Sequence, residues 1–422
     1  MRCFAISLYL LALMLYALAG TPLAPFHGDE STLIYGSRDY FDQFVARDMQ
    51  RVMNLRDDDP MDHNLRLLDG RVQTYLGGFA YHLTGGTADG LNQPWLWGAP
   101  AQFNLDDGHV PDDRLLMAQR WAMALLLALS IPAAYGVGTQ MGGMWGGLVM
   151  ATLVAVSPNL ALNGRRVMME APLLLFSLLT TLAALRIAAS SQPTANSGRR
   201  TAVYLLLLGL GAGMALGSKH SALFTVAPLF GALGLWMLWR RCWRGVAGLM
   251  VAGVIATAVY LALNPAWWAN PVDTGREMLA LRTELLASQT ANLGGYADFG
   301  GALRGFVEYA VLETPQYFEV AGWEEVGTTI AAYEASPWVL SPLMNAVRAA
   351  VTSVCAALGI AALIRRRDGV AWVAGIWIIG AVGSALLLTP LPWARYYLTA
   401  LPAIYALAAA GLGHLVTLRR TP

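Results

Sequence analysis

The chain has 422 residues, of which 56% are hydrophobic and only 13% are charged. A soluble domain carries about twice that share of charged residues. The net charge of +1 gives no electrostatic reason to expect a nucleic-acid partner. The composition therefore excludes an ordinary soluble domain and predicts a protein of helices that cross a membrane many times.

Apolar runs of about 17–25 residues, the length that crosses a bilayer as a helix, recur along the chain. Ten membrane spans are predicted, over residues 4–20, 114–136, 144–162, 168–188, 201–217, 222–239, 246–263, 341–363, 370–388 and 395–417. They predict an all-α polytopic membrane protein, with residues 1–422 as a single integral membrane domain. The first run could instead be a cleaved signal peptide, because it is short and Ala17-Leu18-Ala19 resembles a cleavage site.

The charges predict which loops face the cytoplasm. Arginine clusters fall between alternate spans, at Arg199-Arg200, Arg240-Arg241 with Arg244, Arg365-Arg366-Arg367 and Arg419-Arg420. The positive-inside rule places these clusters and both termini in the cytoplasm. Of the 27 acidic residues, 15 lie in segment 21–113 and 10 in segment 264–338, which are therefore predicted to be two long external loops.

Both loops are expected to carry helices. Apolar residues from Phe41 to Met53 repeat at helical spacing opposite a charged face. This pattern favours an amphipathic helix on the membrane surface over one packed on a soluble domain. Further helices are expected over residues 67–83, 274–291 and 301–313. Between the predicted spans 114–136 and 144–162, Gly142-Gly143 indicates a close helix contact or a tight turn.

The most informative motif is His27-Gly28-Asp29-Glu30, directly after the first span. Two adjacent carboxylates at a membrane surface are costly unless a reaction or a ligand uses them. Asp29 could instead cap a helix that begins near Ser31, with Glu30 favouring its positive end. The two readings are compatible, and the charge pattern predicts that the pair faces outward.

Three basic turns are predicted on the same external side, against the positive-inside bias. They contain Arg165-Arg166, Arg395 and Lys219, which is the only lysine in the chain. Each could be a snorkelling side chain or a phospholipid contact. Together they indicate a shared anionic ligand such as a phosphate.

Three further residues are candidates for ordering this site. Glu170 lies one helical turn after Arg166, where it could pair with an arginine or position the site. His220 follows Lys219, and His27 precedes the acidic pair. A divalent cation near His27 and Asp29 stays open, but no metal site is predicted, and Cys3, Cys242 and Cys355 form no cysteine metal site.

A carboxylate base opposite phosphate-binding cations suggests glycosyl transfer from a polyprenyl-phosphate sugar to an external hydroxyl. A transporter or flippase for a lipid-linked sugar is the alternative, although such proteins place charges near the midplane and often show two related halves. A non-catalytic scaffold of a cell-envelope complex is a third reading.

The motifs resemble those of glycosyltransferase family 39, the dolichyl-phosphate-mannose protein mannosyltransferases and their bacterial relatives, which have the GT-C fold. The residues that carry the resemblance are the Asp29-Glu30 pair, the stretch 67–86, Ser157-Pro158 through Glu170-Ala171-Pro172, Gly217-Ser218-Lys219-His220-Ser221, and Arg395-Tyr396-Tyr397 with Pro402. The resemblance covers most of 1–265 and the last ~35 residues of the chain.

The resemblance implies a mechanism and roles for these residues. Asp29 would be the base on the acceptor hydroxyl, with Glu30 aiding the acceptor or the site. The donor would be a polyprenyl-phosphate sugar, attacked with inversion and without a required cofactor. Lys219, Arg165, Arg166 and Arg395 would be candidates for the donor phosphate. The acceptor would be a hydroxyl of a protein, a glycan or a lipid. The chain departs from the family in having Glu170 where relatives often have Asp, in its ten spans, and in its segment 264–338.

Overall fold

The structure of the chain is a computed structural model, which describes residues 2–55, 60–190, 197–319 and 327–418. All regular secondary structure in these residues is helical. Eight of the described helices are long and apolar enough to cross a membrane. They are α1 (Arg2–Ala19), α8 (Asp113–Val156), α10 (Glu170–Ala189), α11 (Ser197–Ser218), α12 (Leu223–Trp239), α13 (Trp243–Leu263), α17 (Pro342–Arg365) and α18 (Gly369–Leu387).

The ten predicted spans all fall on helices: nine correspond to the eight long helices, one of which contains two arms, and the tenth corresponds to a shorter helix. Helix α8 has 44 residues and is interrupted at Gly142 and Gly143, whose φ of 66° is one that L side chains rarely adopt. The arms fold back on one another, since a Cβ added to Gly138 would lie 2.4 Å from the Gly146 carbonyl oxygen. The predicted tight turn is confirmed. The last predicted span corresponds to α19 (Leu401–Leu418), a shorter apolar helix.

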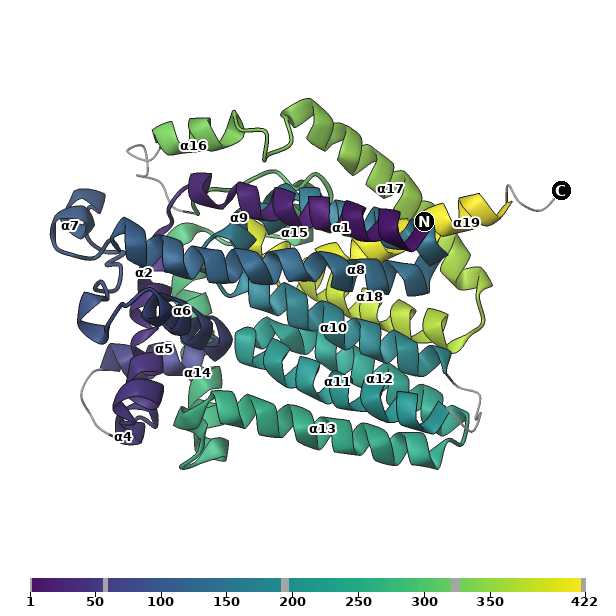
Figure 1. Cartoon of the computed structure of the whole chain (residues 1–422), viewed down its shortest axis with the longest axis horizontal. Helices are drawn as coiled ribbons and strands as arrows, with labels where there is room; N and C mark the ends of the chain where they lie inside the picture. Colours follow the sequence, from purple (N-terminus) through teal and green to yellow (C-terminus); the bar gives the residue numbers. More distant parts are fainter. Residues whose placement is uncertain (1, 56–59, 191–196, 320–326, 419–422) are drawn as a thin grey trace.

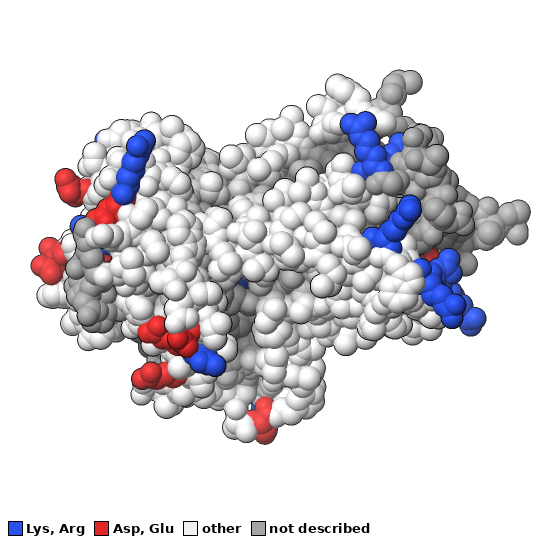
Figure 2. All heavy atoms as spheres, turned by 90° about the horizontal axis from the view of Figure 1, so that it is seen from below, with Lys and Arg blue, Asp and Glu red and all other residues white. Residues whose placement is uncertain are grey.

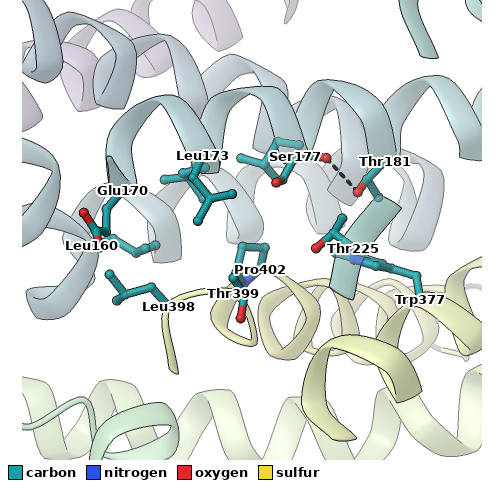
Figure 3. Close-up of a pocket in the computed structure, with 12 residues that line it drawn as sticks. Leu160, Glu170, Leu173, Ser177, Thr181, Thr225, Trp377, Leu398, Thr399 and Pro402 are labelled. Atoms are coloured by element: carbon teal, nitrogen blue, oxygen red, sulfur yellow. Dashed lines mark hydrogen bonds between the residues drawn. The ribbon is translucent and has the colours of Figure 1, made fainter. Parts of the chain in front are cut away.

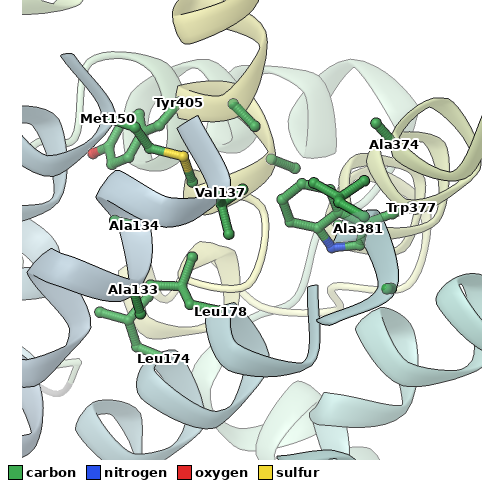
Figure 4. Packing of buried hydrophobic residues seen from close by; sticks show 14 of the residues in the cluster. Ala133, Ala134, Val137, Met150, Leu174, Leu178, Ala374, Trp377, Ala381 and Tyr405 are labelled. Atoms are coloured by element: carbon green, nitrogen blue, oxygen red, sulfur yellow. The ribbon is translucent and has the colours of Figure 1, made fainter. Parts of the chain in front are cut away.

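The membrane helices pack side by side around a core of small and branched side chains (Figure 1). Figure 4 shows this core, where Ala134 and Val137 of α8, Leu178 of α10, and Trp377 and Ala381 of α18 meet. All five side chains are buried, and small residues let the helix backbones approach closely. The core fixes the ends of these helices, and therefore the loops that they carry.

Charge separates the two ends of the bundle. Figure 2 shows most of the visible lysine and arginine at one end and most of the visible aspartate and glutamate at the other. The start of α1 and the end of α19 lie toward the basic end in Figure 1, whereas the short helices between α1 and α8 and helix α14 lie at the opposite end. We call the opposite end the acidic end. This separation agrees with the positive-inside pattern, and which side of the membrane each end faces stays a prediction.

The two predicted loops both contain helices. The first holds α2 (Gly28–Tyr35), α3 (Arg38–Tyr40), a π-helix (Phe41–Ala46), α4 (Met49–Val52), α5 (Pro60–Leu68), α6 (Arg71–Leu83) and α7 (Ala101–Asp106). The second holds α14 (Pro271–Leu293), α15 (Phe299–Phe306), a π-helix (Val307–Val311) and α16 (Gly327–Glu334). The expected helices near 274–291 and 301–313 are confirmed.

The single amphipathic helix expected between Phe41 and Met53 is wrong. The chain turns at Arg47, which has a φ of 59°, and the helix is divided there. Asp39 belongs to the charged face that was predicted for this helix, but it is buried and pairs with Arg66 and Arg71 at 2.8 and 2.7 Å. Long-range ion pairing therefore folds this segment against α5 and α6, where local periodicity predicted a surface helix.

Candidate active site

Helix α2 presents the acidic pair, and His27 caps it. The His27 side chain accepts a hydrogen bond from the Asp29 backbone N–H at 3.1 Å, and Glu30 accepts one from the His27 N–H at 3.1 Å. This reciprocal arrangement is a capping box, which satisfies the free N–H groups at a helix start. The alternative that Asp29 caps a helix beginning near Ser31 is wrong. The Asp29 carboxylate is thereby left available for other contacts.

The Asp29 carboxylate forms an ion pair with Arg395, which lies just before α19. Arg395 also contacts Glu319 at 3.2 Å, and Glu319 contacts His27 Nε2 at 2.6 Å. The four side chains form one cluster that joins the first and last parts of the chain. Asp29 keeps 24% of its side chain exposed, so a ligand can still reach it.

The cluster keeps both of its carboxylates ionised. Burial would raise the pKa of Asp29, but the charges of Arg395 and His27 outweigh it and the pKa is lowered. Burial likewise opposes ionisation of Glu319, and Arg395 and His27 again lower its pKa. Asp29 is therefore a carboxylate at neutral pH, which is the state that a base requires.

Glu30 is held in a different way. It is fully buried and forms a two-pronged ion pair with Arg120, at 2.8 and 2.6 Å. Its oxygens also accept from the backbone N–H groups of Val167 and His27. Every lone-pair direction is engaged by protein, so this geometry revises the catalytic assignment of Glu30. Glu30 positions α2 against the turn between α9 (Pro158–Arg165) and α10.

Arg165 and Arg166 lie at that turn, and both are buried. Arg165 is fully buried, and its guanidinium donates to the carbonyls of Tyr16, Ala17 and Trp338 and to the Tyr333 hydroxyl. Its assignment as a phosphate ligand is revised, because its donors are committed to these groups.

Arg166 is also buried and donates to the carbonyls of Pro25 and Tyr317 at 2.9 and 3.0 Å. Its guanidinium also lies over the Phe318 ring. These contacts place Arg166 as an anchor of the segment that carries Glu319, so its phosphate assignment is revised as well.

Lys219 lies in the turn between α11 and α12, as expected, and donates to Glu170 at 2.7 Å. The reading in which Glu170 orders the site through a cation is thus favoured over pairing with Arg166. Gly70 packs on this turn so closely that an added Cβ would lie 1.7 Å from the Ser218 carbonyl oxygen. The turn before α6 is thereby held against Lys219.

A cavity of about 270 Å³ opens beside Lys219 at the acidic end. Its polar lining includes Lys219, His220, Arg282 and Tyr396. Its apolar lining includes Leu68, Met169, Leu223, Phe224, Leu286 and Leu388. Leu223 and Leu388, at the ends of α12 and α18, are 53% and 61% exposed. We call this space the Lys219 cavity; it has a cationic side and an apolar side that includes these two exposed leucines.

A second, narrower space runs into the bundle from Glu170. Figure 3 shows Glu170 at one end, with Ser177 and Thr181 further along α10 and Thr399 near Pro402. Its volume is about 20 Å³, room for about one water molecule. The Lys219 cavity is therefore the better substrate site of the two.

Sequence reasoning missed four charged residues near these groups: Arg120, Glu319, Arg282 and Asp69. Arg120 carried a signal, because it is an ionisable residue inside a predicted span. Glu319 and Arg282 lie in the second long loop and match no motif, and Asp69 lies in the stretch 67–86, where no role was assigned to it. Burial raises the pKa of Asp69 to about 6, with Arg71 opposing and Asp29 adding to the shift. Asp69 is thus a carboxyl group that changes charge close to neutral pH.

No group of three or more histidine, cysteine, aspartate or glutamate side chains suited to a metal ion is found among the described residues. In the cluster around Asp29, the positive charge that faces the carboxylates comes from Arg395. The need for a divalent cation stays untested.

Residues 87–274 match the family described as dolichyl-phosphate-mannose-protein mannosyltransferase. The predicted resemblance to this family is confirmed. The matched stretch contains Arg165, Arg166, Glu170 and Lys219 and does not contain Asp29. A relative is protein O-mannosyl-transferase 1 of Mus musculus, 29% identical over 204 residues, which are 47% of this chain and 24% of the mouse protein.

The fold is similar to that of archaeal oligosaccharyltransferase AglB from Archaeoglobus fulgidus, solved in complex with an inhibitory peptide and a dolichol-phosphate. The TM-score is 0.50 at 14% identity, over 98% of this chain and 51% of AglB. This likeness shows a GT-C-type bundle and nothing of substrates. The chain thus spans about half the length of AglB and about a quarter of the mouse protein.

Proposed function

We propose that the chain is a membrane glycosyltransferase that moves a sugar from a polyprenyl-phosphate donor to an acceptor hydroxyl. The observation that carries the proposal is the Lys219 cavity, which joins cationic side chains to an apolar wall of exposed Leu223 and Leu388. A polyprenyl-phosphate sugar has the same two parts, a phosphate and a long hydrocarbon. The hydrocarbon would remain in the membrane while the phosphate enters beside Lys219.

The sugar would lie between the Lys219 cavity and Asp29. Tyr396 lines the cavity, and the next residue toward the N-terminus, Arg395, pairs with Asp29. The two sites are therefore one residue apart in the chain. In the proposal the base and the phosphate would lie on opposite sides of the anomeric carbon, as an inverting displacement requires.

The proposed step is a displacement at the anomeric carbon of the donor sugar. The acceptor oxygen forms a bond to the anomeric carbon, and the bond from that carbon to the phosphate oxygen breaks. The bonding electron pair leaves on the polyprenyl phosphate, and the acceptor proton passes to Asp29. Because the pKa of Asp29 is lowered, the proton transfers only once the attacking hydroxyl has become acidic in the transition state.

Arg395 would hold Asp29 ionised and oriented, rather than bind the donor phosphate directly as first expected. Its guanidinium bridges Asp29 and Glu319. The acidic end would face outward, which the distribution of charge supports. The acceptor would be a hydroxyl of a protein, a glycan or a lipid.

The test uses the purified full chain in lipid nanodiscs with a panel of labelled polyprenyl-phosphate sugars and a hydroxyl acceptor. The expected result is release of polyprenyl phosphate together with a glycosylated acceptor of inverted anomeric configuration. A transporter or flippase would move the intact donor in vesicles and release none. Absence of release with every donor, from protein that is folded, would overturn the proposal.

A further inference from the structure

Helix α14 of the second predicted loop carries a cation that no motif singles out. We propose that Arg282 is the principal ligand of the donor phosphate, with Lys219 as its partner across the cavity. The inference rests on the proposed function and adds a specific residue to it. Arg282 lies outside the stretch that matches the mannosyltransferase family.

The position of Arg282 follows from the half-buried face of α14. Arg282, Leu286 and Gln289 follow one another at helical spacing and are all partly buried. Arg282 and Leu286 both line the Lys219 cavity. Gln289 accepts a hydrogen bond from the Tyr396 hydroxyl at 3.4 Å, which ties this face of α14 to the segment that carries Arg395.

Arg282 differs from the other candidate phosphate ligands because their side chains already have partners in the protein. Arg395 and Lys219 pair with Asp29 and Glu170, and Arg165 and Arg166 donate to protein oxygens. Within the part of the chain that the structure describes, Arg282 forms no hydrogen bond or ion pair. A guanidinium that lines a cavity with its donors unused is suited to a ligand that brings its own acceptors.

The charge balance of the cavity supports the same assignment. Glu170 already neutralises Lys219, so that pair contributes no net charge to the cavity. A polyprenyl-phosphate sugar is a phosphodiester with one negative charge, which the single unpaired charge of Arg282 matches. When the sugar leaves, the phosphate gains negative charge, and the fork of Arg282 can donate to two of its oxygens at once.

The field of Arg282 reaches the groups around the proposed sugar position. Its charge, together with that of Lys219, opposes the burial that raises the pKa of Asp69.

The test measures binding of a short-chain polyprenyl phosphate to the full chain in nanodiscs, which does not depend on transfer. Arg282→Gln is expected to weaken binding about 10- to 100-fold, the range of one hydrogen-bonded charge. Arg282→Lys should recover part of the loss, because it restores the charge but not the fork.

Arg276→Gln is the matched control, since Arg276 lies on the same helix with 77% of its side chain exposed and, among the described residues, pairs only with Asp273. It should bind like the wild type, and both Gln variants should keep the wild-type melting temperature. Equal binding by Arg282→Gln and Arg276→Gln would overturn the assignment. If the wild type binds through Arg282 but transfers no sugar from any donor, the anion site stands and the proposed reaction fails.

Discussion

Two clusters of charged side chains lie at the acidic end of this molecule, and they differ in how completely their charges are used. In the saturated cluster, Asp39 accepts four hydrogen bonds from Arg66 and Arg71. Its side chain is 5% exposed, against 24% for Asp29 in the open cluster with Arg395. The comparison separates charges that hold the fold from charges that remain accessible to a ligand.

The largest effect is expected from Asp29→Asn in the open cluster. Loss of the base should lower the turnover number about 10²- to 10⁴-fold, since a positioned base contributes that much. Donor binding and the melting temperature should stay near wild type, because Arg395 keeps its contact with Glu319. Transfer rates and donor binding in nanodiscs check this, with exposed Asp89→Asn as the control. Wild-type turnover by Asp29→Asn would remove Asp29 as the base.

The corresponding change in the saturated cluster, Asp39→Asn, should lower the stability of the protein. Asp39→Asn leaves Arg66 and Arg71 buried without their shared carboxylate, and breaking a buried pair costs about 3–5 kcal/mol. The melting temperature in detergent should fall strongly, while the protein that remains folded keeps the wild-type Michaelis constant. A raised Michaelis constant at an unchanged melting temperature would show that the two clusters are not separable.

A smaller effect on phosphate binding is expected from a change at Gly70, which packs on the turn between α11 and α12 that holds Lys219. Gly70→Ala places a Cβ 1.7 Å from the Ser218 carbonyl oxygen, so the turn must shift, at a cost of about 1–3 kcal/mol. Polyprenyl phosphate should bind more weakly because Lys219 moves with that turn. Gly98→Ala is the control, since its added Cβ meets no atom within 4 Å. Unchanged phosphate binding by Gly70→Ala would separate the turn from the site.

The smallest effect concerns pH. The pKa of Asp69 is raised to about 6 from 3.8, so the folded state prefers the neutral form. Its contribution makes the protein less stable as the pH rises from about 4 to about 6, and the loss persists above that range. Asp69→Asn should therefore raise the melting temperature at pH 7.5 but not at pH 4.5.

Asp29 and Glu319 have lowered pKa values and act in the opposite direction, since their stabilisation is lost as the pH falls below their ordinary pKa values. The Asp69→Asn variant should still lose this stabilisation at low pH. Melting curves across the pH range distinguish the two contributions. The same melting temperature for wild type and Asp69→Asn at both pH values would contradict the raised pKa.

The sequence was sufficient for the membrane helices, because a bilayer imposes long apolar runs and the basic loops mark alternate connections. It also identified Asp29, Lys219 and Arg395 as an acid and two cations at one end. Their partners were beyond local patterns. The pair Asp29–Arg395 joins residues 366 positions apart, and Asp39 meets Arg66 only through the folding of α5. Arg282 and Glu319 carried no motif, so only the packing of the second loop places them.

The ion pair between Asp29 and Arg395 has a consequence for synthesis of the chain. A ribosome adds about 5–20 residues per second, so on the order of tens of seconds separates the two residues as the chain is made. During that interval α2 can form its capping box, but Asp29 lacks the cation that orients it. The proposed sugar transfer would therefore not begin on a nascent chain, and a product terminated before Arg395 should insert into the membrane yet remain inactive.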